Sequence, residues 1–227
     1  MTLKPKVITC RVMAEEFREL MPPGTEIQEF EISLHVHPAK LMETLQEAVT
    51  AADGLYDPIF LGYGMCSKAV VGLVAQHSRM VVFKTDDCIG IFMGSMKVQR
   101  EQAFRAPGSY FLSRGWIGDG VGSIFDEYNR LEARYGTDRA MKVFRTLMVH
   151  YNRITHILIP GAASQEADRA YAQAMATKFG LDYVELQGTI QLIQAMIAGT
   201  PDDDIISVAP GQPITLEMMV SKELGGA

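Results

Sequence analysis

Short apolar runs that alternate with helix-like stretches are the feature that most constrains the fold of this chain. In the last third, strand-like runs at 156–160, 182–186 and 205–209 are separated by helix-like stretches at 164–180 and 189–198. Such short connections are typical of parallel strands joined by right-handed crossovers. We therefore predict an α/β fold with a mostly parallel, open, Rossmann-like sheet and helices on both faces. A division into two similar halves is compatible with this pattern.

The first part of the chain shows the same alternation. Strands are expected at 6–10, 30–34, 59–61 and 81–87, and helices at 11–20, 38–53 and 67–76. The length and the lack of a linker-like stretch favour a single domain over residues 1–227. If the chain divides, we expect the boundary near Gly136, between a cysteine-bearing half and a C-terminal β-α-β-α-β half.

Composition excludes several classes of protein. The net charge is -6, and no cluster of Lys and Arg offers a surface for nucleic acid. No apolar run approaches the roughly 18 residues of a membrane span, and the N-terminal apolar segment is too short for a signal peptide. The three cysteines form no disulfide framework, so we expect a cytoplasmic protein.

All three cysteines stand where a strand-like run gives way to a helix-like stretch: Cys10, Cys66 and Cys88. In a parallel sheet these junctions share the edge at which open α/β folds place their sites. A helix N-terminus also favours thiolate over thiol. We expect the thiols to meet there and to bind zinc or an iron–sulfur cluster. The alternative is that the cysteines only pack, as buried free cysteines often do.

Neighbouring residues extend this candidate site. His35 follows a predicted strand and would add a metal ligand, or else lie in solvent beside a helix cap. Asp87 would cap the helix that starts at Cys88, or orient a metal-bound histidine or accept a proton. Gly62 and Gly64 would let a cofactor approach the backbone. Two loops, 118–123 and 160–164, carry weaker signals for anion binding.

Several motifs together resemble a known but uncharacterised prokaryotic family, domain of unknown function sixteen thirty-eight. The resemblance rests on Cys10, on Leu34-His35 with Pro38, on Gly62-Tyr63-Gly64-Met65-Cys66, on Asp87-Cys88-Ile89, on Pro107-Gly108-Ser109-Tyr110-Phe111-Leu112 and on Gly115-Trp116. The resemblance implies no established activity, but it marks a set of recurring residues: Cys10, His35, Tyr63, Cys66, Asp87, Cys88 and Trp116. Among these we predict Tyr63 and Asp87 as catalytic residues and Trp116 as a cofactor-binding residue. The resemblance also implies a role in or beside corrinoid-dependent one-carbon metabolism. The expected partner is a small molecule or a corrinoid or methyltransferase protein, and an oligomer is compatible with the sequence.

The chain departs from the family pattern at two places. Cys66-Ser67-Lys68-Ala69 replaces a Cys-Gly-Asn-Gly-like string, and Asp86-Asp87-Cys88 replaces His-Asp-Cys. Two hypotheses follow. In the first, the protein is a metal-thiolate protein and, if an enzyme, one of a metal-dependent methyl- or thiol-transfer type. In the second, it is a metal-free, small-ligand-binding accessory or regulatory module whose cysteines are structural.

Overall fold

The structure is a computed structural model that describes residues 3–117, 123–161 and 165–220. The chain divides into two compact units. Unit 1 consists of Met1–Val98 and Thr189–Ala227, and unit 2 of Gln99–Gly188. No helix among the described residues is long and apolar enough to cross a bilayer.

Unit 1 is built on a five-stranded sheet of order β2-β1-β3-β4-β8. Its strands are β1 (Lys6–Cys10), β2 (Glu26–Phe30), β3 (Ile59–Gly62), β4 (Met80–Phe83) and β8 (Ile205–Val208). The first four are parallel, and β8 runs antiparallel to β4. β1, β3 and β4 are buried at every residue, as expected for parallel strands covered on both faces. The predicted mostly parallel α/β sheet is confirmed.

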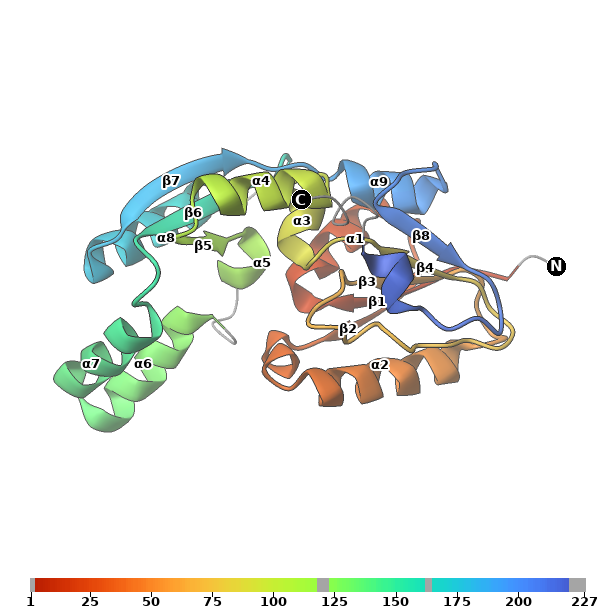
Figure 1. The fold of residues 1–227 in the computed structure, drawn as a ribbon, viewed down its shortest axis with the longest axis horizontal. Helices are drawn as coiled ribbons and strands as arrows, with labels where there is room; N and C mark the ends of the chain where they lie inside the picture. The colour runs from red at the N-terminus through yellow and green to blue at the C-terminus, as the bar shows by residue number, and fades with distance from the viewer. Residues whose placement is uncertain (1–2, 118–122, 162–164, 221–227) are drawn as a thin grey trace. The chain divides into compact units, whose positions relative to one another are not determined.

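Helices cover both faces of this sheet. They are η1 (Arg11–Met13), α1 (Ala14–Leu20), η2 (Ile32–Val36), α2 (Pro38–Ala52), α3 (Cys88–Phe92), α9 (Gln191–Ala198) and α10 (Leu216–Met219). Within unit 1, Figure 1 shows α2 on one face and α1 with α9 on the other. The chain crosses from β1 to β2 in one direction and from β2 back past β1 to β3 in the other, so right-handed crossovers place α1 and α2 on opposite faces.

Unit 2 is built on a three-stranded parallel sheet of order β5-β6-β7. Its strands are β5 (Ser109–Leu112), β6 (Arg153–Leu158) and β7 (Asp182–Gln187), and its helices are α5 (Arg114–Ile117), α6 (Ile124–Tyr135), α7 (Thr137–Leu147) and α8 (Gln165–Phe179). Helix α4 (Met96–Arg105) spans the boundary between the units. An aromatic core joins α6, α7 and α8, with the rings of Phe144 and Phe179 stacked 3.8 Å apart. β5 is an edge strand of this sheet.

Two predicted elements and one predicted strand pairing are wrong. Residues 67–76 form turns up to Gly72 and then an irregular loop instead of a helix, because Cys66, Ser67 and Lys68 have positive φ angles that a right-handed helix cannot contain. The strand at 30–34 ends at Phe30 and gives way to η2. The last strand, β8, does not join the C-terminal parallel sheet but pairs with β4 in unit 1. Gly136 lies between α6 and α7, and loop residues 118–122 and 162–164 lie outside the described residues.

Candidate functional site

Four adjacent parallel strands of unit 1 end at one edge of the sheet. In the order β2-β1-β3-β4, the chain leaves β1 for β2 on one side and later returns to β3 on the other (Figure 1). Ligands of open α/β folds bind at the carboxyl ends of strands where the order reverses in this way. The carboxyl ends of β1 and β3 are therefore the expected position of a site.

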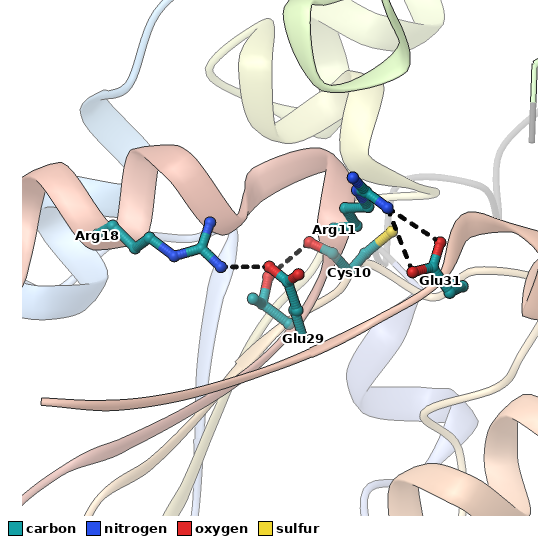
Figure 2. Close-up of polar contacts among 6 residues, drawn as sticks. Cys10, Arg11, Arg18, Glu29 and Glu31 are labelled. Carbon is teal, nitrogen blue, oxygen red and sulfur yellow. Dashed lines mark hydrogen bonds and ion pairs between the residues drawn. The ribbon is translucent and has the colours of Figure 1, made fainter. Parts of the chain in front are cut away.

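Cys10 is the last residue of β1, and its side chain is buried. Burial is the main reason that the pKa of this thiol rises to about 11. The backbone N–H of Val12 opposes the shift, while the carboxylates of Glu31 and Glu29 add to it. Figure 2 shows Cys10 with these two glutamates and their arginine partners. Cys10 is therefore a neutral thiol at physiological pH. It lies beside a charged rim, the ion pairs Arg11–Glu31 and Arg18–Glu29.

The loop after β3 carries Tyr63 and Cys66 and is held in a strained shape. The φ angles of Cys66, Ser67 and Lys68 are 44°, 57° and 71°, and each such non-glycine residue costs about 1–3 kcal/mol. Two backbone hydrogen bonds tie the loop to the segment after β4: Met65 N–H donates to Thr85 O at 2.7 Å, and Cys66 N–H to Asp86 O at 3.0 Å. This conformation fixes Cys66 beside the end of β4.

Tyr63 and the two thiols form one electrostatic cluster. Burial, then Asp87 and then Cys10 raise the pKa of Cys66. Burial, then Cys10 and then Cys66 raise the pKa of Tyr63. Among the described residues the buried Tyr63 hydroxyl has no hydrogen-bond partner, a state that costs about 1–3 kcal/mol. The cluster thus contains a hydroxyl donor without a partner among the described residues, near two neutral thiols.

His35 stands in η2, directly after β2, and stacks on Tyr63 with ring centroids 6.0 Å apart. Its Nδ1 lies 3.1 Å from the carbonyl oxygen of Ile32. Since a carbonyl only accepts hydrogen bonds, Nδ1 carries the proton and Nε2 keeps its lone pair. Burial lowers the pKa of His35, and the charge of Asp87 opposes the shift. His35 is therefore a neutral imidazole that offers one basic nitrogen.

Asp87 is the N-cap of α3, where Oδ1 accepts a hydrogen bond from Ile89 N–H at 2.9 Å. The interpretation of Asp87 as a helix cap is confirmed. Its charge also acts on Cys66 and His35, so the same carboxylate belongs to the cluster. Cys88 is the first residue of α3 and is buried.

The predicted cofactor-binding residues have other neighbours. A Cβ at Gly62 would lie 2.2 Å from Thr9 Oγ1, and one at Gly64 would lie 2.6 Å from Thr85 Oγ1. Close packing of unit 1 therefore accounts for both glycines. Trp116 belongs to α5 of unit 2, where it packs against the aromatic core. Its buried indole N–H has no partner among the described residues.

The donors of the cluster suit a soft metal in type but do not form a ready site. Two sulfurs, an imidazole nitrogen and a carboxylate are ligands that zinc accepts. Within residues 3–117, 123–161 and 165–220, however, no three His, Cys, Asp or Glu side chains are grouped so as to hold a metal ion. A metal would need these side chains to move closer together and the thiols to lose their protons.

The sequence interpretation missed the charged rim of the site. Arg11 follows Cys10 directly, and its Nη1 donates to both carboxylate oxygens of Glu31 at 3.3 and 3.4 Å. The position of Arg11 next to a candidate cysteine was a usable signal. The pairing with Glu31 depends on the parallel register of β1 and β2, which the sequence pattern does not specify.

Comparison with known proteins gives one match. The model of a family described as a protein of unknown function (DUF1638) matches residues 30–197, which include all the candidate site residues except Cys10. No curated protein and no solved structure matches the chain.

Proposed function

We propose that this chain, which belongs to the DUF1638 family, binds a small molecule at the carboxyl ends of β1 and β3. The observation that carries the proposal is the Tyr63 hydroxyl, which is buried, has no partner among the described residues and lies close enough to Cys10 and Cys66 for them to raise its pKa. A donor kept unsatisfied in this way is stabilised when a bound group accepts its hydrogen bond.

The chemistry of the surroundings limits the ligand. Cys10 and Cys66 are neutral thiols, His35 is a neutral imidazole, and Tyr63 is the donor. The ligand therefore presents a hydrogen-bond acceptor to Tyr63 and a soft or apolar surface to the sulfurs. His35 is half-buried, and its Nε2 keeps a lone pair because Nδ1 carries the proton. Nε2 is therefore the base that would take a proton from a ligand or a thiol.

Native mass spectrometry of protein purified without oxygen tests this function. We expect a retained small molecule on the wild type that is lost from Tyr63→Phe, which removes only the donor. Tyr135→Phe, on an exposed side chain of unit 2, is the matched control and should retain it. The same mass excess on all three proteins, or none on any, would contradict the proposal.

A second candidate is a metal-thiolate centre of zinc or an iron–sulfur cluster. One observation favours it: His35 donates Nδ1–H to a backbone carbonyl, the arrangement that orients metal-binding histidines through their other nitrogen. Cys10, Cys66 and His35 would be the ligands. A zinc ion there would hold a substrate thiol as thiolate and make it a methyl acceptor, which would suit a role in or beside corrinoid-dependent methyl-group metabolism.

Metal and acid-labile sulfide analysis of the same preparation separates the two candidates. Stoichiometric zinc or iron that is lost from both Cys10→Ala and Cys66→Ala would support the metal centre. A metal-free protein whose Cys→Ala variants still fold would rule out the metal centre and leave small-molecule binding as the remaining candidate function. Retention of all the metal in Cys10→Ala would show that a metal site, if present, does not use β1.

A further inference from the structure

A pocket of unit 1 lies at the end of the sheet opposite the candidate site. Three of its lining residues, Pro5, Pro58 and Arg79, directly precede β1, β3 and β4, so the pocket stands at the amino ends of these parallel strands. Its volume is about 320 Å³, within the roughly 300–1,000 Å³ of small-molecule sites. Tyr63 follows β3 and lies at the other end of the sheet.

The pocket forms because two helices stop short of these strand ends. Phe60 of β3 and Val81 of β4 are paired in register, so their side chains point to the same face, where both line the pocket. Figure 1 shows α1 and α9 on one face of this sheet. Helix α1 ends before Pro22, and α9 ends before Gly199, whose φ is 67°. The space beyond the helix ends is therefore lined mostly by apolar side chains.

Arg79 is the one charged residue among the described residues that line the pocket. Its backbone is fixed on both sides, because its N–H donates to Asp57 Oδ1 at 2.9 Å and its carbonyl accepts from Ile59 N–H at 2.9 Å. Its guanidinium has no hydrogen-bond or ion-pair partner in the part of the chain that the structure describes. The pocket thus combines an apolar lining with one cation that is available to a ligand.

The ends of α1 and α9 do not account for this cation. A helix C-terminus carries a partial negative charge that an arginine would stabilise. However, the carbonyl oxygens of Phe17 in α1 and of Ala195 and Met196 in α9 already accept backbone hydrogen bonds, at 2.9, 3.0 and 3.3 Å. Within the described residues the Arg79 guanidinium bonds to neither helix. It is therefore held at the pocket without a structural partner there.

We propose that this pocket binds a small apolar molecule that carries a single carboxylate. The carboxylate pairs with the Arg79 guanidinium, whose planar fork matches it, and the apolar part lies against Phe60 and Val81. A cavity of about 150 Å³ holds benzene, so the larger volume here suits an acid with one ring or a short chain. This second site goes beyond the proposed function, because it shares no residue with the cluster around Tyr63.

Amide NMR titration of the whole chain tests the inference. The probes are phenylacetate and hexanoate, each compared with its neutral amide. We expect saturable shifts of the Phe60, Val81 and Gly199 signals. Each acid should bind about tenfold more tightly than its amide, the effect of a hydrogen bond to a charged group. Tyr63→Phe should bind the acids as the wild type does, because the two sites lie at opposite ends of the sheet.

Two variants with matched controls connect the binding to the pocket. Arg79→Gln should lower the affinity for each acid to that for its amide. Arg139→Gln, at an exposed arginine of α7 that also has no partner among the described residues, should keep the preference. Ala198→Trp should fill the pocket from the exposed end of α9 and abolish binding of every probe, whereas Ala133→Trp, at an exposed alanine of α6, should not. Unchanged signals outside the pocket show that each variant is folded.

Binding of neither acid at millimolar concentration would overturn the inference, and so would a preference for the acids that survives Arg79→Gln. Shifts at the carboxyl ends of β1 and β3 that vanish in Tyr63→Phe would place the acids in the first site and also overturn it. The proposed function is judged separately by ligand retention, so that either site can fail without the other.

Discussion

At the scale of single residues, Tyr63 and Tyr128 bury their rings equally but differ in what the hydroxyl group meets. Each is 1% exposed. The Tyr128 hydroxyl donates to Glu132 Oε1 at 2.7 Å, whereas that of Tyr63 has no partner among the described residues. A buried hydroxyl without a partner destabilises a fold, and proteins keep such costs where function needs them.

The two tyrosines should therefore respond in opposite ways to loss of the hydroxyl. In ligand-free protein we expect Tyr63→Phe to raise the free energy of unfolding by about 1 kcal/mol, and Tyr128→Phe to lower it by about 1 kcal/mol. Urea denaturation measures both. Equal destabilisation by the two substitutions would mean that the Tyr63 hydroxyl is already satisfied in the fold.

Two histidines should make stability depend on pH below neutrality. Burial is the main reason that the pKa values of His35 and His156 are lowered in the fold, whereas the unfolded value is about 6.5. Below that value the unfolded chain binds more protons than the folded chain, so stability falls as pH decreases from about 6.5 towards the lower folded pKa values.

Replacement of either histidine by Gln should reduce this loss of stability. Denaturation midpoints at intervals between pH 7 and 5 give the slope, and NMR titration of the imidazole signals gives the folded pKa values directly. A folded pKa above the unfolded value for His35 would reverse the sign and contradict the neutral imidazole at the site.

At the scale of elements, most of the strands that position the site could be predicted from the sequence. The apolar runs at 6–10 and 59–61 and the proline at the start of α2 define β1, β3 and α2 by local pattern alone. The helix predicted at 67–76 failed because its apolar spacing suits either turn or helix, and only contacts with the segment after β4 select the left-handed residues. Cys66 does follow β3 at the predicted edge of the sheet, but a turn follows it and not the predicted helix N-terminus.

The aromatic core of unit 2 illustrates an element that packing determines. Phe144 of α7 stacks on Phe179 of α8 and contacts Tyr128 of α6 edge to face. We expect Phe144→Ala to lower the free energy of unfolding by about 3–5 kcal/mol, through lost burial and a cavity. Val143→Ala, on a neighbouring side chain that is 42% exposed, should change it by less than about 0.5 kcal/mol. Similar effects of both substitutions would contradict this core.

At the scale of the whole molecule, the chain forms two sheets where the sequence pattern predicted one. β8 follows α9 closely, as a C-terminal parallel strand would, but pairs antiparallel with β4. Nothing local distinguishes these partners, because pairing depends on contacts between distant segments. For the same reason the local pattern did not reveal the boundaries of the units: one lies within α4, after Val98, and the other follows Gly188, a glycine like those of ordinary loops.

The division into units predicts that damage in one leaves the other protected. In Phe144→Ala we expect faster amide hydrogen exchange in β5, β6 and α8, whose side chains share the aromatic core. Protection of β1, β3 and β4 should stay near the wild-type level, because they belong to the core of unit 1. Exchange that rises equally in both sets of strands would show that the two units unfold together.

The central claim is that Tyr63, Cys10 and Cys66 surround a ligand at the ends of β1 and β3. A high-resolution crystal structure of protein purified without oxygen tests it most directly. We expect density for a bound group that accepts a hydrogen bond from the Tyr63 hydroxyl at about 2.7 Å and lies against both sulfurs. A Tyr63 hydroxyl bonded to a protein atom, with no bound group between the two cysteines, would contradict the account.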